Sequence, residues 1–152
     1  MLHAVLQVVM GWEGGHLHEF VIGDTRYGEP DPDFPDEFPC VDETKVTLAK
    51  ALGARKSCKY IYDYGDDWEH RVTVEKVLLP DTDLPCPLCL DGRNACPPED
   101  VGGVPGYYEF LEVLNDPTHD EHQQMLEWCG GGFDLTAFDL SDVNQRLSEI
   151  KL

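Results

Sequence analysis

The segment YIYDYGDDWEHRVTV, Tyr60–Val74, gathers aromatic rings, carboxylates, a histidine and an arginine around one glycine. Its alternation of aromatic and polar residues predicts a β-hairpin with a three-residue turn at 65–67. In that register Tyr64 faces Trp68. The ligand-binding candidates of this region, with one histidine from an earlier strand, are His18, Asp63, Tyr64, Trp68, Glu69, His70 and Arg71. We assign no catalytic residue.

Two carboxylates of this hairpin, Asp63 and Glu69, are expected to lie across from each other on one face. Such a pair repels and raises one pKa, which is the condition for a general acid. An ion pair with Arg71 is the simpler account. Asp66 and Asp67 are more simply the polar tip of the turn, where their side chains bond the backbone.

The opposite face of the hairpin is aromatic and could hold a ligand or a peptide, because such rings give large contact areas with polar tips. We expect Tyr60 and Tyr62 to lie in the core. Tyr64 and Trp68, beside the turn, are expected at its rim.

A cysteine loop, CPLCLDGRNAC, could bind zinc through Cys86, Cys89 and Cys96. A C-x2-C pair on a turn lets two thiolates face one ion, and a structural site needs four ligands. The alternative is free thiols in a loop. The candidates for the fourth ligand, which only the fold could bring near, are Cys40, Cys58, Cys129, His119 and His122.

Two histidines, His16 and His18, lie two residues apart on an expected strand and therefore project from the same face. With Asp63, Glu69 or His70 nearby they could bind a divalent ion. Ordinary packing of neutral histidines is the alternative.

The order of elements favours an α+β fold with a single antiparallel or mixed sheet that contains the Tyr60–Val74 hairpin and is covered by helices. Hydrophobic spacing and turn residues predict helices at 2–11, 42–53, 107–114, 117–129 and 141–150, a strand at 16–22, and loops at 28–40 and 80–106. A chain of 152 residues is the size of one domain, so we expect 1–152 to be a single domain.

The charge is strongly negative, with 30 Asp and Glu against 11 Lys and Arg, a formal net charge of −19. We expect no direct binding to nucleic acid, because such proteins neutralise phosphates with a basic surface. No apolar run approaches the length of a membrane span and no signal peptide is visible. We therefore expect a cytoplasmic protein without a membrane partner.

Several motifs together resemble the plasmid Ri ORF-three-like family, whose members are often labelled transposon-passenger or TnpR-like proteins. They are GW followed by HLHEF, YDYGDDWEHRVTVE, C-x6-CPPEDVGG, FDL and VN. The resemblance implies an α+β fold and a bacterial, archaeal or mobile-element setting, but no established activity. Members usually carry an extra N-terminal strand segment, which this chain lacks, so an open sheet edge could recruit a second copy into a homodimer.

We reject resolvase chemistry, which the label suggests. A serine recombinase needs arginines around a nucleophilic serine and a basic DNA-binding element, whereas this chain has three serines and five scattered arginines. We expect a non-catalytic binding or accessory protein with a protein partner. The alternatives are a metal-dependent hydrolase using His18, Asp63 and His70, and an acidic protein that docks on a basic DNA-binding partner.

Overall fold

The computed structural model describes residues 1–30, 39–79 and 86–150, which form two compact units. Unit 1 comprises Met1–Gly15 with Pro80–Leu152, and unit 2 comprises His16–Leu79. The described residues hold five α-helices and one open, mixed, five-stranded sheet, which confirms the predicted α+β class. The single domain stays a prediction.

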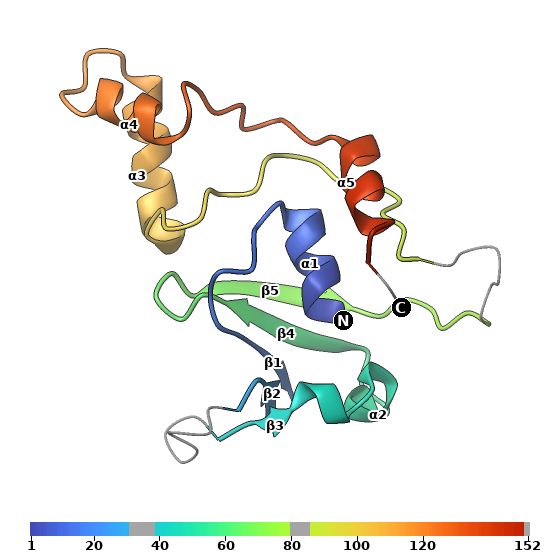
Figure 1. Cartoon of the computed structure of the whole chain (residues 1–152). Coiled ribbons are helices and arrows are strands. Elements are labelled where there is room, and N and C mark those ends of the chain that lie inside the picture. The colour runs from blue at the N-terminus through green and yellow to red at the C-terminus, as the bar shows by residue number, and fades with distance from the viewer. Residues whose placement is uncertain (31–38, 80–85, 151–152) are drawn as a thin grey trace. The chain divides into compact units, whose positions relative to one another are not determined.

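All five strands belong to unit 2 (Figure 1). They are β1 (His18–Ile22), β2 (Thr25–Gly28), β3 (Val41–Asp42), β4 (Ser57–Tyr62) and β5 (Trp68–Thr73). Their order is β3-β2-β1-β4-β5, with β2 and β3 parallel and the other neighbours antiparallel. β1 ends before Gly23, as predicted, and Gly23 turns the chain into β2 with a left-handed φ of 63°. β3 and β5 are therefore the edges of the sheet.

The predicted hairpin exists, but its register is shifted by two residues. Trp68 lies opposite Tyr62, not Tyr64, and residues 63–67 form the connection. The cause is local: Asp63 and Asp67 adopt left-handed φ angles of 59° and 54°, and the Asp67 N–H donates to the Asp63 carbonyl at 2.6 Å. Because the shift is even, the side chains that remain in the two strands keep their predicted faces.

The core of unit 2 is the aromatic face of the sheet. Tyr60 is fully buried, and its ring centroid lies 5.0 Å from that of Phe20 and 6.5 Å from that of Tyr62. The predicted core positions of Tyr60 and Tyr62 are thus confirmed. Trp68 is also buried, so its predicted rim position is wrong, whereas Tyr64 is exposed.

The helix predicted at 42–53 is two shorter elements, η1 (Glu43–Lys45) and α2 (Leu48–Leu52). Thr47 separates them, because its extended backbone lets the hydroxyl accept from the Lys50 N–H and cap α2. Most of the predicted loop at 28–40, residues 31–38, lies outside the described residues, as does the start of the loop predicted at 80–106.

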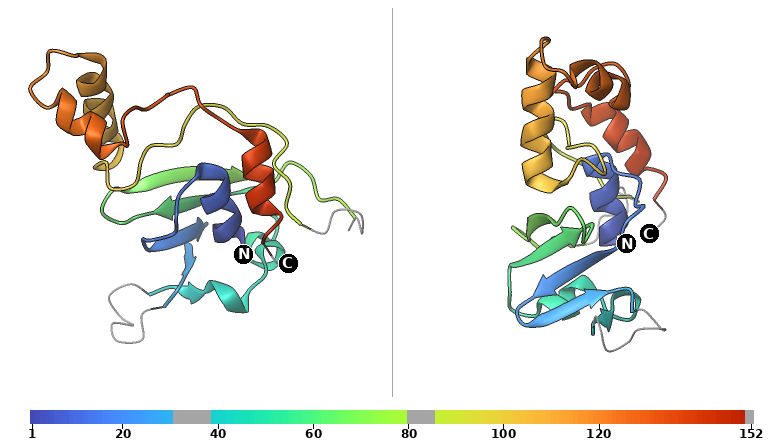
Figure 2. Two further views of the ribbon diagram at one scale, coloured as in Figure 1. Left: turned by 45° about the horizontal axis from the view of Figure 1, so that its top comes forward. Right: turned by 90° about the vertical axis from the view of Figure 1, so that its left-hand side faces the viewer.

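Unit 1 is helical, with α1 (Leu2–Met10), α3 (Gly103–Asn115), α4 (His122–Trp128) and α5 (Leu140–Leu147). α1 contacts α5, and α3 packs against α4, which the further views show as a helical pair (Figure 2). α1 ends, as predicted, at Gly11, whose φ of 88° is left-handed. The ring of Phe110 meets those of Trp128 and Phe133 at 5.7 and 5.2 Å.

Two helix starts in unit 1 differ from the prediction. α4 begins at His122 rather than 117, because the Asp116 carboxylate accepts from the N–H and hydroxyl of Thr118 and closes a separate turn. α3 begins four residues before the predicted 107, after Gly102 at a left-handed φ of 91°.

Candidate functional site

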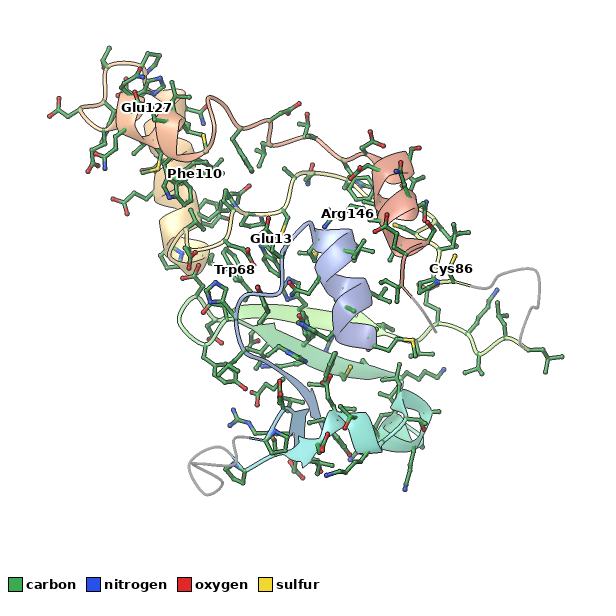
Figure 3. The ribbon with its side chains drawn as sticks, viewed as in Figure 1. Glu13, Trp68, Cys86, Phe110, Glu127 and Arg146 are labelled. Atoms are coloured by element: carbon green, nitrogen blue, oxygen red, sulfur yellow. The ribbon has the colours of Figure 1, made fainter. Side chains whose placement is uncertain are left out.

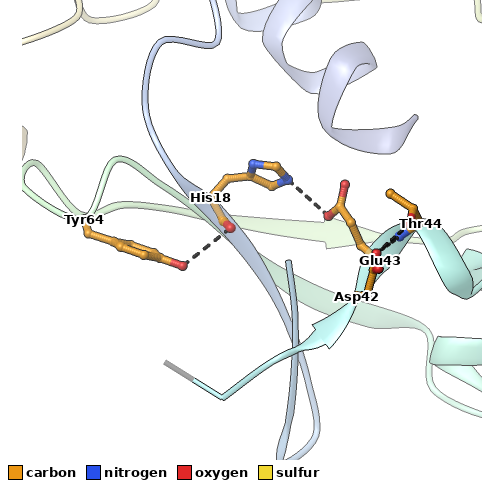
Figure 4. A network of polar contacts seen from close by, with 5 residues as sticks. All are labelled: His18, Asp42, Glu43, Thr44 and Tyr64. Carbon is orange, nitrogen blue, oxygen red and sulfur yellow. Dashed lines mark hydrogen bonds and ion pairs between the residues drawn. The ribbon is translucent and has the colours of Figure 1, made fainter. Parts of the chain in front are cut away.

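One histidine–carboxylate pair joins β1 to η1. His18 Nε2 lies 3.1 Å from Glu43 Oε2, and both side chains are largely buried, at 12% and 20% exposure (Figure 4). Asp42 fixes the start of η1 by accepting from the Thr44 N–H at 2.9 Å. The ion pair with Lys45 is the main cause that lowers the Asp42 pKa to about 2. The sequence analysis missed Glu43, which no periodic pattern marks.

A second histidine–carboxylate pair lies at the start of β1 and the end of β4. His16 Nδ1 is 3.6 Å from Asp63 Oδ2, and the side chains are 31% and 12% exposed. The two elements are joined at this point because the Asp63 N–H donates to the Leu17 carbonyl at 2.9 Å. Of the metal ligands expected around His16 and His18, the structure thus brings Asp63 to His16.

The predicted opposition of Asp63 and Glu69 is wrong. Glu69 lies opposite Ile61, because Asp63 has left the strand for the loop. Glu69 accepts from Lys59 Nζ at 2.7 Å, rather than pairing with Arg71 as expected. Both members of this pair are solvent-exposed, so neither the acid–base pair nor the simpler Arg71 ion pair forms as expected.

Tyr64 and His70 occupy different environments. The Tyr64 hydroxyl reaches toward the His18 carbonyl at 3.5 Å (Figure 4). Partial burial, followed by the nearby Glu19 carboxylate, raises the Tyr64 pKa. Burial lowers the pKa of His70, whose ring lies 5.6 Å from that of Tyr60. His70 is therefore a neutral imidazole at neutral pH.

The three residues of the hydrolase alternative do not converge. Within the described chain, His18, Asp63 and His70 form no group of ligand atoms close enough to share an ion. His18 contacts Glu43, Asp63 contacts His16, and His70 packs on Tyr60. These three residues thus belong to separate contacts rather than to one centre.

The cysteine loop lies in unit 1. Among the residues that the structure describes, Cys86, Cys89 and Cys96 do not form a group of three close ligands. Burial, with help from the Glu99 carboxylate, raises the pKa of the Cys96 thiol to about 12, which opposes the thiolate that zinc requires. Zinc at these cysteines stays a prediction.

Asn144, which the sequence analysis did not single out as a site residue, holds the cysteine loop. Its Oδ1 accepts from the Cys89 N–H at 2.8 Å, and its Nδ2 donates to the Cys89 carbonyl at 2.9 Å. Trp12 Nε1 donates to the Pro97 carbonyl at 3.0 Å. The loop is thus shaped by two side chains far away in the sequence, with Cys86 near its start (Figure 3).

An ion pair with one buried member was also missed. Arg26 Nη2 lies 3.0 Å from Glu19 Oε1, and the Glu19 side chain is almost fully buried. Glu19 faces Gly28 across the β1–β2 ladder, so Arg26, two residues away, is its diagonal neighbour. Recognition of β2 would have revealed this pair.

The α3 and α4 helices of unit 1 carry acidic residues and no lysine or arginine. Residues 94–145 contain 11 Asp and Glu and no Lys or Arg. Phe110 lies inside the α3–α4 pair, whereas Glu127 lies on α4 with its side chain exposed (Figure 3). Beside the acidic residues, Tyr108 is 64% and Trp128 48% exposed. This acidic helical surface, defined by the exposed residues of α3 and α4, combines negative charge with aromatic rings.

None of the helices in the described ranges is both long enough and apolar enough to cross a membrane.

The comparisons with known proteins give relatives but no activity. An uncharacterised protein of Sinorhizobium fredii, y4hQ, is 42% identical to this chain, over 98% of this chain and 77% of that protein. The crystal structure of a protein of unknown function from Methanosarcina mazei Go1, MM3350, matches with a TM-score of 0.79 and 40% identity, covering 93% of this chain and 80% of that one. The family model described as plasmid pRiA4b ORF-3-like protein matches residues 1–142. The chain therefore belongs to the plasmid pRiA4b ORF-3-like protein family.

Proposed function

We propose that the chain is a non-catalytic binding protein that docks through its acidic helical surface on a basic surface of a protein partner. The observation that carries the proposal is the segment 94–145, with 11 acidic residues and no lysine or arginine. A surface of one sign attracts an oppositely charged partner and repels nucleic acid.

The exposed aromatic rings support a docking role for the acidic helical surface rather than a role in solubility alone. Tyrosine and tryptophan are enriched at the centres of protein interfaces, where they give large contact area. Tyr108 and Trp128 lie on α3 and α4, the same two helices that carry Glu109, Glu112 and Glu127. Charge would steer the encounter, and the rings would supply contact.

The proposal keeps the predicted accessory role in a mobile-element setting. The family is named after a plasmid reading frame, which agrees with that setting. It also assumes a reducing cytoplasm, which the six free cysteines support.

The test starts with the immobilised chain in a lysate of its host, and continues with the captured protein after purification. We expect a basic partner whose binding weakens steeply with salt, because mobile ions screen exposed charges beyond about 8 Å at physiological ionic strength. Binding that is retained in high salt would overturn the proposal.

A charge-matched pair of variants locates the surface. Glu109→Gln, Glu112→Gln and Glu127→Gln together remove three exposed charges from α3 and α4, and Asp24→Asn, Glu29→Gln and Glu75→Gln together remove three exposed charges from unit 2. The first variant should bind the purified partner at least about tenfold more weakly, as several rim charges together change association. The second should bind like wild type, and equal losses in both would contradict the assigned surface.

A further inference from the structure

The distance between His16 and Asp63 fits two ligands of one metal ion better than a direct hydrogen bond. His16 Nδ1 and Asp63 Oδ2 are 3.6 Å apart, whereas N–H···O hydrogen bonds span about 2.7–3.2 Å. Zinc binds imidazole nitrogen and carboxylate oxygen at about 2.0–2.2 Å, so two ligands of one tetrahedral ion lie about 3.4 Å apart. The donor atoms are thus close enough to share an ion.

The Asp63 carboxylate is held in position by the loop around it. Its Oδ1 accepts from the N–H groups of Gly65 and Asp66 at 2.8 and 3.3 Å, so Oδ2 is the oxygen that faces His16. Its backbone adopts φ 59°, a turn conformation that aspartate tolerates. The loop therefore orients one carboxylate oxygen without the ion.

His16 is oriented by packing and remains accessible. Its ring meets the buried Tyr62 ring edge-on, with centroids 5.8 Å apart. The hydrogen bond between Leu17 and Asp63 fixes the backbone next to it. At 31% exposure, the His16 side chain is reachable from solvent.

We propose that His16 Nδ1 and Asp63 Oδ2 bind a divalent transition-metal ion of the zinc type, with water completing its coordination. One imidazole and one carboxylate suit zinc, cobalt or manganese rather than calcium, which prefers oxygen ligands alone. The site is independent of the acidic helical surface and of the cysteine loop, since neither supplies these two ligands.

The test titrates metal-stripped, full-length protein with Co²⁺ and Zn²⁺ by absorption spectroscopy and calorimetry. Asp63→Asn keeps the turn, because the amide oxygen still accepts from Gly65 and Asp66 and asparagine tolerates a left-handed φ. It removes the charged ligand. We expect Asp63→Asn and His16→Gln each to weaken metal binding more than about tenfold. Mutation of residues that only contact a metal ligand typically already costs about tenfold in metal affinity.

Two controls separate this site from others. Asp116→Asn with His119→Gln changes an exposed turn aspartate and a nearby histidine in unit 1, and should bind metal like wild type. Cys86→Ser with Cys89→Ser should also retain the ion. Wild-type affinity in folded Asp63→Asn would overturn the proposal. A sulfur-to-cobalt charge-transfer band that disappears in the cysteine variant would assign the ion to the cysteine loop and overturn it too.

Discussion

Unit 2 and unit 1 divide apolar burial and charge unequally. Among the described residues, the buried apolar side chains of unit 2 are Phe20, Ile22, Leu52, Cys58, Tyr60, Ile61, Tyr62 and Trp68, and those of unit 1 are Trp12, Phe110, Val113, Val143 and Leu147. Unit 2 carries 14 Asp and Glu with eight Lys and Arg, whereas unit 1 carries 16 with three. Unit 1 is the longer of the two, yet it buries fewer apolar side chains and has the larger charge imbalance.

Apolar packing and surface charge are therefore concentrated in different parts of the chain. The aromatic layer of unit 2 packs rings against rings, and such dense packing makes each side chain costly to remove. In unit 1 the like charges repel one another, which opposes compaction but favours an oppositely charged partner.

The largest effect should follow removal of the central ring of unit 2. Tyr60→Ala deletes a fully buried ring that contacts Phe20, Tyr62 and His70. We expect a loss of about 3–5 kcal/mol in the free energy of unfolding, the usual range for large aromatic truncations. Urea unfolding measures it. Tyr64→Ala, at an exposed position, should cost less than about 1 kcal/mol, and similar losses would contradict the assigned core.

A smaller loss is expected in unit 1. Leu147→Ala on α5 removes a buried side chain and should cost about 2–3 kcal/mol, at the low end for leucine because a thinner core relaxes more easily. Leu140→Ala, on the same helix but partly exposed, is the control and should cost clearly less. If Leu147→Ala destabilises as much as Tyr60→Ala, the contrast between the two cores is wrong.

The N-cap of α5 comes next in size. The Asp139 carboxylate accepts from the N–H groups of Ser141 and Asp142 at 2.9 and 3.0 Å. Asp139→Ala should therefore cost about 1 kcal/mol, as loss of such caps usually does. Asp139→Asn keeps an acceptor oxygen and should restore most of the stability. Equal stability of the wild type, Asp139→Ala and Asp139→Asn, measured by urea unfolding with circular dichroism, would contradict the role of Asp139 as the N-cap.

His70 should give unit 2 a pH dependence. Burial lowers its folded-state pKa below the ordinary 6.5, so below that pH the unfolded chain takes up a proton before the folded one does. The contribution of His70 to stability is therefore fully present above pH 6.5 and decreases as the pH falls toward the folded-state pKa. His70→Gln should make the free energy of unfolding depend less on pH below about 6.5. Two outcomes would contradict a role of His70. One is an unchanged slope of unfolding free energy against pH in His70→Gln, and the other is an equal reduction of that slope by His119→Gln at an exposed histidine.

The smallest effect concerns the exposed pair of Lys59 and Glu69. Their contact spans 2.7 Å across β4 and β5, but solvent screens it. A double-mutant cycle with Lys59→Ala and Glu69→Ala should give a coupling of about 0.2–1 kcal/mol that decreases with salt. A coupling above about 2 kcal/mol would contradict the view that solvent screens this pair and that surface charge adds little to the stability of unit 2.

The sequence allowed prediction of much of the fold, and the failures have physical causes. Alternation revealed β1 and the β4–β5 hairpin, and Gly11 marked the end of α1. β2 and β3 have four and two residues, too few for a period to be visible. The hairpin register depended on Asp63 leaving its strand, which its side-chain type permits but does not require.

Residue types indicated the candidate site residues but not which of them contact each other. His16, His18 and Asp63 stand out by residue type, but the pairing of β1 with β4 and the hydrogen bond from Asp63 to Leu17 bring Asp63 to His16. Glu43 reaches His18 from an element 25 residues later, across residues without any periodic pattern. Such contacts depend on tertiary folding, so spacing along the chain could not reveal them.

The two hydrogen bonds between Asn144 and Cys89 also bear on the order of folding. They join positions 55 residues apart, and a contact over such a separation forms only after the intervening chain has been ordered at an entropic cost. During synthesis from the N-terminus, Cys89 leaves the ribosome long before Asn144 does. We therefore expect the cysteine loop to reach its final conformation late, with its thiols accessible to oxidants and metal ions in the nascent chain before α5 folds.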